Sequence, residues 1–355
     1  MPNHRQFTIF LVILLCAIAC TPEKSFVIVK PGQLVRFYNA DSTLYGFKNH
    51  EGEIIVDTVF SKDKNSVKIV SAKEINNGYD FYHVTYDGRI VARDSVYLPD
   101  LDTDCENEGH IRFWDKKKRD SRTGLLNAKG EVVIPAVYSD MEPSVNGLVN
   151  CLEGAKLKNI EGEIYRYVGG HHVLRDTLGT ILIKNFEPKK GTPYFCSLRI
   201  TDAPDPDPLR ESFKTTKGNY YSFLILEKEM EQWFFNHFCI VRSLVDLKKL
   251  CFEEVSFNGS SQPVTSDCLT ENEFKEIKES TLTSRLKPRI SIWGLPSFDR
   301  EKYKAFFDYC GKYKQSKYPV LNVNYEDIVQ YEFIYTSEGF KLSGVYYLSL
   351  IHISE

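Results

Sequence analysis

The chain has 355 residues, of which 42% are hydrophobic and 26% are charged. This is a globular composition, and it excludes collagen-like, disordered and multi-span membrane proteins. Lys and Arg number 45 against 48 Asp and Glu, so the net charge is -3 and there is no global positive field to hold a nucleic acid. We therefore expect no nucleic-acid partner.

The N-terminal residues have the pattern of an export signal. A short polar head precedes an apolar run from Phe7 to Leu15, and small residues follow it as far as Cys20. A stretch this short with a small-residue end is typical of a secretory signal rather than a spanning helix. The ending Ala17-Ile18-Ala19-Cys20 resembles a bacterial lipobox. The alternative is an ordinary signal peptide with a chance cysteine.

The lipobox resemblance implies a location and a partner. It implies a lipoprotein signal peptide over residues 1–19, cleavage before Cys20, and acylation of the Cys20 thiol and amine. The acylated Cys20 then anchors the protein to a lipid bilayer in the cell envelope. By analogy with lipoprotein sorting in some Gram-negative bacteria, Thr21 in place of aspartate favours the outer membrane. We expect residues 20–41 to form a tether and a first strand.

Seven cysteines remain once Cys16 and Cys20 are set aside, and an odd number leaves at least one free or paired between chains. Their spacing is wide and no CxxC occurs, so we expect no thiolate zinc site. Cys151, Cys239 and Cys251 lie among apolar residues and are predicted to be core residues. The disulfide pairing stays open.

A degenerate repeat fills the N-terminal half. Its skeleton is Asn, Asp or Thr, two free residues, Gly, a polar residue and a branched apolar run. The polar side chain starts a turn, the glycine supplies a positive φ, and the branched run forms a strand. One hairpin cannot bury its own face, so neighbouring copies must stack. The alternative is unrelated hairpins that share common turn chemistry. The paired turn positions are Asn49 and Gly52, Thr85 and Gly88, Asn127 and Gly130, Asn159 and Gly162, and Asp176 and Gly179.

The best copy resembles the WG-repeat family of bacterial proteins. Thr123-Gly124-Leu125-Leu126-Asn127 stands in place of the family's Trp-Gly-Tyr-Ile-Asp, and the Gly, Ile-Pro and Tyr positions follow as Gly130, Ile134-Pro135 and Tyr138. The defining tryptophan is absent from every copy, and Trp293-Gly294 lies outside them. The resemblance implies an all-β repeat domain over residues 42–186 and carries no catalytic residues.

The chain changes character after residue 186. Prolines recur through residues 187–218, which we predict to be a Pro-rich linker. Asp202, Asp205 and Asp207 lack the glycine turn and distal glutamate of a calcium loop, so the linker is favoured.

Residues 219–347 are predicted to form an α+β domain. Ser243 is expected to cap a helix over residues 244–251, and residues 270–273 have the pattern of a capping box. A strand over residues 289–293, an amphipathic helix from residue 297 or 299 to near 314, and a final hairpin are predicted next. This order and Gly339-Phe340-Lys341-Leu342 loosely resemble the nuclear transport factor two superfamily.

The last residues, 348–355, resemble the translation of a common sequencing adapter, so we expect read-through there. The alternative is an ordinary last strand.

Motifs that carry chemistry are scarce. No GxSxG, P-loop, GxGxxG or HExxH pattern occurs. His171 and His172 are adjacent, so on a strand they point to opposite faces and do not share a metal. His237 lies in an aromatic stripe and is expected to be a core or rim residue. The run Lys116-Lys117-Lys118-Arg119 is either a polyanion patch or a solvated hairpin tip.

The sequence therefore predicts a β-rich repeat domain of consecutive β-hairpins followed by an α+β domain. No catalytic, cofactor-binding or metal-binding residue is predicted, and no cofactor is expected. We expect a membrane-anchored, non-enzymatic binding or scaffold protein whose partner is an envelope protein or glycan. The alternative is a small-molecule or enzymatic site inside a cone-shaped C-terminal domain. A deep pocket there with a buried His237 or a buried carboxylate favours this alternative, and a filled interior counts against it.

Overall fold

We describe the fold from a computed structural model of the chain. The residues it describes are 35–61, 71–75, 78–85, 89–92, 95–98, 104–115, 122–162, 164–258, 263–283, 288–296, 299–308, 312–325 and 329–347.

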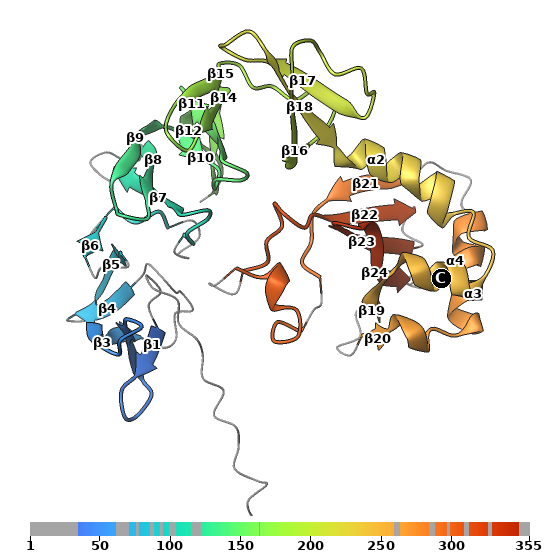
Figure 1. The fold of residues 1–355 in the computed structure, drawn as a ribbon, viewed down its shortest axis with the longest axis horizontal. Helices are drawn as coiled ribbons and strands as arrows, with labels where there is room; N and C mark the ends of the chain where they lie inside the picture. The colour runs from blue at the N-terminus through green and yellow to red at the C-terminus, as the bar shows by residue number, and fades with distance from the viewer. Residues whose placement is uncertain are drawn as a thin grey trace, which may run out of the picture.

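The described chain has two parts, an array of small antiparallel sheets and a mixed sheet with three helices (Figure 1). This confirms the predicted fold class. The strands of the array are β1 (Val35–Tyr38), β2 (Leu44–Lys48), β3 (Ile54–Ser61), β4 (Ser71–Ile75), β5 (Gly78–Val84), β6 (Ile90–Val91), β7 (His110–Asp115), β8 (Arg122–Asn127), β9 (Val132–Tyr138), β10 (Asp140–Met141), β11 (Leu148–Glu153), β12 (Lys156–Glu161), β13 (Ile164–Val168), β14 (His171–Asp176), β15 (Ile181–Ile183), β16 (Pro193–Thr201), β17 (Arg210–Lys214) and β18 (Tyr220–Ile225).

The structural unit of the array is a three-stranded antiparallel sheet, which we call a module. The first module is β1-β2-β3, the second is β4-β5-β6, the third is β7-β8-β9 and the fourth contains β11-β14-β15. In each of them a repeat turn joins the central strand to the last strand. The first and third modules have the same register, with bulges at the same two places. A common register in segments of different sequence favours a true repeat over unrelated hairpins.

The bulge explains the glycine that precedes the turn. Residues 135–137 of β9 bulge opposite Gly124, and a Cβ on Gly124 lies only 2.7 Å from the Ile134 carbonyl oxygen. Gly46 is crowded in the same way by the backbone of Val56 in the first module. The fourth module carries Val173 at the equivalent position. Its bulge is shorter, because only residues 184–185 lie between Ile183, which pairs with Leu174, and Phe186, whose N–H donates to the His172 carbonyl. The wide bulge, more than the turn, therefore requires the glycine.

Successive modules stack through equivalent turns. The Glu108 carboxylate accepts the backbone N–H groups of Asn146 and Gly147 at 2.7 and 2.9 Å, which joins the turn before β7 to the turn before β11. The Arg89 guanidinium donates to the Lys129 carbonyl at 2.9 Å, which joins the repeat turns of the second and third modules. These contacts link each unit mainly to its neighbours, as in other repeat proteins.

The array continues beyond the residues predicted for it. Residues 187–218, predicted as a linker, contain β16 and β17, which pair with β18 in an antiparallel sheet. The proline-rich residues 202–208 lie in the loop between β16 and β17. Prolines there end the strands, but the flanking residues pair their backbone with β18. The Thr216 N–H donates to the Leu182 carbonyl at 2.8 Å and so stacks this sheet on the fourth module.

The C-terminal part is one six-stranded sheet of order β20-β19-β24-β23-β22-β21, in which β19 and β24 are parallel. Its elements are α2 (Leu226–Trp233), the π-helical turn η2 (Phe234–Phe238), α3 (Leu244–Leu250), β19 (Cys251–Phe257), β20 (Val264–Thr265), the 3₁₀ turn η3 (Ser266–Cys268), α4 (Glu271–Thr283), β21 (Arg289–Ile292), the 3₁₀ turn η4 (Lys304–Phe306), β22 (Val320–Tyr325), β23 (Val329–Thr336) and β24 (Gly339–Tyr347).

Several local predictions for this part are confirmed. The Ser243 hydroxyl accepts the Asp246 N–H at 3.2 Å at the start of α3. Thr270 and Glu273 form the capping box before α4, with the Thr270 N–H donating to the Glu273 carboxylate at 2.7 Å. The final hairpin consists of β23 and β24.

The helix predicted from residue 297 or 299 to near 314 is wrong. The described residues there form turns and the short η4 instead. Their aromatic side chains pack against Phe252 and Ile334, on the face of the sheet away from the helices. The chain reverses direction within this segment, and rings from before and after the reversal pack on the sheet. A straight helix could not place both sets of rings there. The packed rings are Tyr303, Phe306, Phe307, Tyr313 and Tyr318.

Candidate functional site

The repeat turns adopt the predicted geometry in three copies. The Asn127 side-chain oxygen accepts the N–H groups of Lys129 and Glu131, each at 3.0 Å, and Gly130 has a φ of +74°. Asn49 with Gly52 and Asp176 with Gly179 repeat this arrangement.

The Thr85 turn is related to these three. The Thr85 hydroxyl accepts the Arg89 N–H at 3.1 Å, and the Thr85 N–H donates to the Arg89 carbonyl at 2.9 Å. Its predicted glycine, Gly88, lies outside the described residues.

The Asn159 copy has a different geometry. β12 continues through Asn159 to Glu161, and the Asn159 side chain donates to the Gly162 carbonyl at 2.6 Å instead of accepting backbone N–H groups. Gly162 still has a positive φ of +57°. β12 and β13 pair with each other only and form a hairpin inserted between β11 and β14. This segment is therefore an insertion in the fourth module rather than a module of its own.

One turn escaped the sequence analysis. The Gly218 N–H donates to the Thr215 carbonyl, and the Thr215 N–H donates to the Asn219 carbonyl at 2.8 Å, as in the other turns. Thr215 and Gly218 have the spacing of the repeat skeleton, which could have predicted this turn. They lie at the end of the proline-rich stretch that was predicted to be a linker. All of these turn residues bond to backbone, so they support the stack and leave few polar atoms for a ligand.

A surface suited to binding lies where the array meets the C-terminal part. Two adjoining cavities of about 610 and 420 Å³ share Val145, Gln315 and Ser316 in their walls. We call them together the cleft. The segment that precedes β22 bridges the two parts, because the Tyr194 hydroxyl donates to the Lys317 carbonyl at 2.8 Å. Figure 1 shows this orange segment reaching from the sheet toward the array.

Three polar side chains meet in the larger cavity. Asn150 on β11 lies opposite the residue after β10, Glu142, whose backbone N–H donates to the Asn150 carbonyl at 2.9 Å. The Nδ1 atom of His172 on β14 lies 3.1 Å from the Asn150 side-chain oxygen. The alternation of side chains along paired strands places all three on one face of the sheet. Apolar side chains complete the wall, among them Tyr194, Phe195, Leu226 and Ile292.

The walls of the cleft affect the charge of Glu142. Desolvation raises the pKa of its carboxyl, although the hydrogen bond with Asn150 and the nearby His172 act in the opposite direction. The side chain still reaches solvent, so the carboxyl remains available as an acceptor for a ligand. The cavity thus offers a carboxyl, an amide and an imidazole beside apolar surface, which is a common composition for binding sites.

The smaller cavity has more charged residues in its wall than the larger one. Arg112 and Asp104 form a buried ion pair at 2.6 Å, and the Arg112 guanidinium lies 4.1 Å from the centre of the Tyr97 ring. Arg112 also donates to the Met141 carbonyl at 2.8 Å. The bonds of Arg112 fix the wall in place. Lysines line the opposite wall, at positions Lys312, Lys314 and Lys317.

The other candidates from the sequence do not assemble into a reactive centre. His171 lies 3.6 Å from Glu153, whereas His172 contacts Asn150, so the two histidines do not share a ligand. His237 is exposed on η2. Among the described residues, no group of three or more His, Cys, Asp or Glu side chains is placed to hold a metal ion.

The buried cysteines do not provide a reactive thiolate either. Burial raises the pKa values of Cys151 and Cys251 to about 12, so both remain thiols at neutral pH. Their burial confirms them as core residues, while Cys239 is half-buried. Cys105 is disulfide-bonded.

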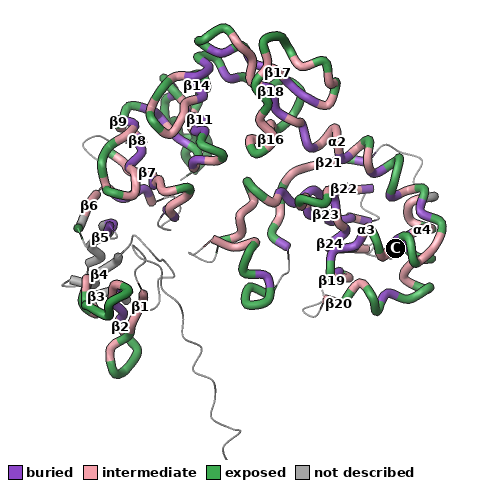
Figure 2. Tube along the Cα trace, in the orientation of Figure 1, coloured by how far each residue is buried: buried purple, intermediate pink, exposed green. Residues whose placement is uncertain are grey.

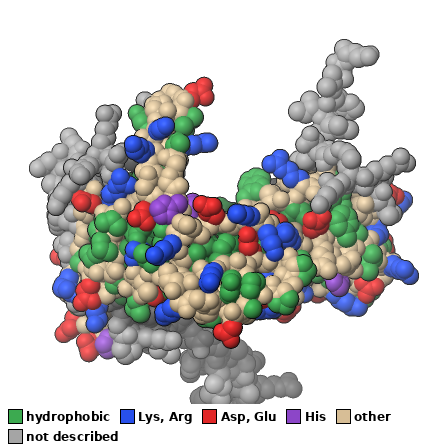
Figure 3. Space-filling view, turned by 90° about the horizontal axis from the view of Figure 1, so that it is seen from above, with side chains coloured by type: hydrophobic (Ala, Val, Ile, Leu, Met, Phe, Trp, Pro, Cys, Tyr) green, Lys and Arg blue, Asp and Glu red, His purple; other side chains and the backbone are tan. Residues whose placement is uncertain are grey.

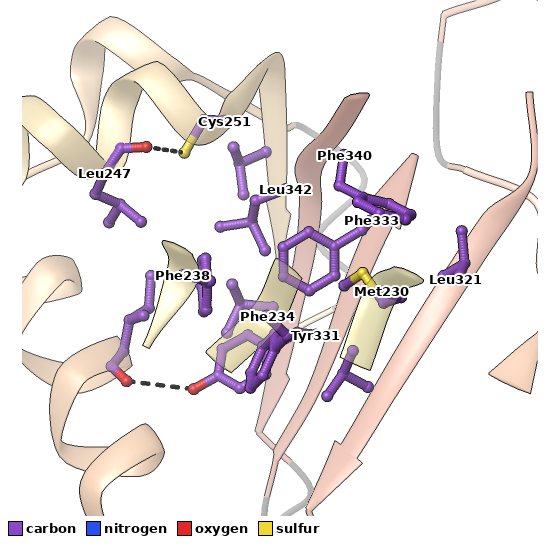
Figure 4. Close-up of a cluster of buried hydrophobic side chains, with 14 of the residues drawn as sticks. Met230, Phe234, Phe238, Leu247, Cys251, Leu321, Tyr331, Phe333, Phe340 and Leu342 are labelled. Carbon is purple, nitrogen blue, oxygen red and sulfur yellow. Dashed lines mark hydrogen bonds between the residues drawn. The ribbon is translucent and has the colours of Figure 1, made fainter. Parts of the chain in front are cut away.

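The interior of the C-terminal part is filled. Phe234 and Phe238 from η2 pack against Tyr331 and Phe333 of β23, with ring centres 5.1 to 5.9 Å apart (Figure 4). The larger cavity touches the rim of this core at Tyr194, Leu226 and Ile292. Among the described residues, the rings from η2 and β23 occupy the interior where the alternative places a ligand site.

Several predictions fall outside the described residues. These concern the signal peptide over residues 1–19, the lipidation site Cys20, the basic run Lys116–Arg119 and the adapter-like residues 348–355. Within the part of the chain that is described, no helix is both long and apolar enough to span a membrane.

Comparison with known proteins identifies one segment. A family model described as a WG containing repeat matches residues 124–149, which run from β8 through the Asn127 turn, β9 and β10 into β11. No curated protein and no solved structure matches the chain. The chain therefore contains a WG-containing repeat at residues 124–149.

Proposed function

We propose that this protein is a lipid-anchored, non-enzymatic binding protein of the cell envelope that holds its partner in the cleft. The observation that carries the proposal is the cleft itself, in which Glu142, Asn150 and His172 converge beside apolar side chains. The repeat turns support this role indirectly. Their polar atoms are used in the stack, so the array acts as a scaffold that presents the cleft wall.

A non-enzymatic role fits the chemistry of the cleft. Catalysis by a nucleophile needs a reactive group hydrogen-bonded to a base, and the thiols of Cys151 and Cys251 are held protonated by burial. His172 is hydrogen-bonded to an amide rather than to a nucleophile. These groups suit recognition of a polar partner, and we propose an envelope protein or glycan rather than a nucleic acid.

The envelope location rests on the lipobox at Cys20 and gains support from Cys105. Disulfides persist in oxidising compartments outside the cytoplasm, and Cys105 is disulfide-bonded. We propose the outer membrane, with acylated Cys20 in the bilayer, because Thr21 follows it.

The binding role is tested by filling the cleft. Ser316 is exposed in the wall shared by the two cavities, so Ser316→Trp should block entry without disturbing the core. The control is Leu178→Trp, at a turn residue that is 83% exposed away from the cleft. Envelope extracts passed over the full chain should yield a partner that Ser316→Trp loses and Leu178→Trp retains. Equal recovery by both variants would contradict a cleft-based function.

The anchor is tested separately. Cys20→Ala should move the protein from the membrane fraction to the soluble fraction, with loss of the acyl mass. A variant that stays in the membrane fraction with an unchanged mass would refute the anchor but not the cleft.

A further inference from the structure

The β12–β13 hairpin is an addition to the repeat. In the third module residues 116–121 connect the first two strands, whereas in the fourth module the corresponding connection holds the whole hairpin. It projects from the array (Figure 3), and every residue of β12 is exposed. By contrast, β11 and β14, between which the hairpin is inserted, both carry buried residues (Figure 2). The stack of modules does not need this hairpin, so its side chains are free to serve another purpose.

The two faces of the hairpin differ in charge. The register places Lys158 opposite Arg166 and Lys156 opposite Val168, so three basic side chains share one face. The other face carries Leu157 opposite Tyr167 and Asn159 opposite Tyr165. We call the first of these the basic face.

The basic face carries three cations and one carboxylate, Glu161, which the register places opposite Ile164 at the end of the face. Lys156, Lys158 and Arg166 are exposed and form no ion pair with any residue that the structure describes. Like charges directly opposite each other on paired strands destabilise the pair. An external anion offsets this repulsion because it attracts both cations, so the arrangement points to an anionic surface as the missing partner.

We infer that the basic face docks on the anionic headgroups of a lipid bilayer. Charge complementarity is the first argument, since basic side chains near an anionic leaflet are attracted to it. Apolar side chains at the end of the basic face are the second argument, because Ile160 and Ile164 are more than half exposed. Side chains of these types enter the interface between headgroups and acyl chains.

The proposed lipid anchor brings the hairpin within reach of the bilayer, and in this respect alone the inference rests on the proposed function. The chain from Cys20 to Val35 contains about 15 residues and spans at most about 50 Å when extended. A single tether leaves the orientation of the array free. Docking of the hairpin fixes the orientation and decides which side of the cleft faces away from the membrane.

The test uses the processed chain, residues 20–355, with Cys20→Ser, so that no acyl chain contributes. We expect it to co-sediment with vesicles of phosphatidylcholine and phosphatidylglycerol at low salt, and not with phosphatidylcholine alone. Added salt should weaken this binding, because exposed charges are screened. The triple variant K156E/K158E/R166E should lose at least about tenfold in affinity, since three basic residues contribute on the order of a hundredfold.

A matched control separates the hairpin from net charge. K129E/K214E/K217E makes the same change in charge at exposed lysines outside the hairpin and should keep affinity within about threefold. Equal losses in the two triple variants, or no binding to anionic vesicles, would overturn the inference. So would binding to dextran sulfate without binding to vesicles, which would assign the face to an anionic glycan. If the charge-reversal variant does not fold, K158Q/R166Q serves in its place with the same criteria.

Discussion

The array and the C-terminal part differ in how far apart in the sequence their paired strands lie. In the array β7 pairs with β8 and β8 with β9, and buried side chains gather in small separate clusters. In the C-terminal part β19 pairs in parallel with β24, as in the contact of Cys251 with Leu342, and one large cluster fills the interior. A destabilising substitution should therefore affect only nearby residues in the array, but it should lower the stability of the whole C-terminal part.

The largest effect is expected in the C-terminal core. Phe234 is fully buried and stacks with Phe238 at 5.2 Å, so Phe234→Ala leaves a cavity that the other rings cannot fill. We expect a loss of about 3–5 kcal/mol in the free energy of unfolding of this part, measured by denaturant titration of tryptophan fluorescence. The neighbouring Phe235 is 41% exposed, and Phe235→Ala should cost about 0.5 kcal/mol. Similar losses for both variants would contradict a single tightly packed core.

A smaller and more local effect is expected in the array. Gly52 and Gly130 both have positive φ, but a Cβ on Gly52 meets open space, while one on Gly130 lies 2.6 Å from Val91 of the second module. Gly52→Ala should cost about 1–2 kcal/mol from backbone strain, and Gly130→Ala about 1–3 kcal/mol more from crowding.

Hydrogen exchange locates this loss. The amides of Gly130 and Glu131, which bond within the turn, should exchange faster in Gly130→Ala, and those of β22 and β23 should not change. Faster exchange throughout the C-terminal sheet would show that the two parts unfold together.

The smallest expected effect is on the pH dependence of stability and comes from a buried carboxyl in the C-terminal part. Arg112 pairs with the buried Asp104 in the array, whereas the carboxyl of the buried Glu332 on β23 has, among the described residues, only the Ser343 hydroxyl as a hydrogen-bond donor, at 2.9 Å. Burial raises the pKa of Glu332, so the folded state holds its proton more tightly than the unfolded state does. Stability from this group is full below the unfolded pKa of about 4.3 and falls as pH rises toward the folded pKa.

Glu332→Gln should remove this pH dependence. We expect the variant to match the parent near pH 4 and to be more stable than the parent at neutral pH, in denaturant titrations at both pH values. A difference that shrinks as pH rises would show that the carboxylate is stabilised in the fold.

The features that the sequence predicted are those that depend on a few adjacent residues. Asn127 with Gly130 and Thr270 with Glu273 act through bonds to nearby backbone, so their spacing was informative. The prediction of a helix starting at residue 297 or 299 was wrong. The aromatic residues there have helical spacing, but their contacts with Phe252 and Ile334 determine the backbone conformation. Tertiary contacts override local propensity in such cases.

The cleft had no signal in the sequence. Asn150 and His172 are ordinary strand residues, and they meet Gln315 and Ser316 only because the array curves back toward the segment before β22 (Figure 1). Contacts between residues this far apart depend on the assembled fold rather than on spacing. Lys158 and Arg166 likewise become neighbours only through the hairpin register.

Site-specific photocrosslinking in living cells tests the central claim most directly. A photoreactive residue at Ser316 reports on the cleft, and the same residue at Leu178 reports on the outer surface of the array. We predict one defined crosslinked species from Ser316 and none from Leu178. No crosslink from Ser316, or the same products from both positions, would contradict a binding function of the cleft.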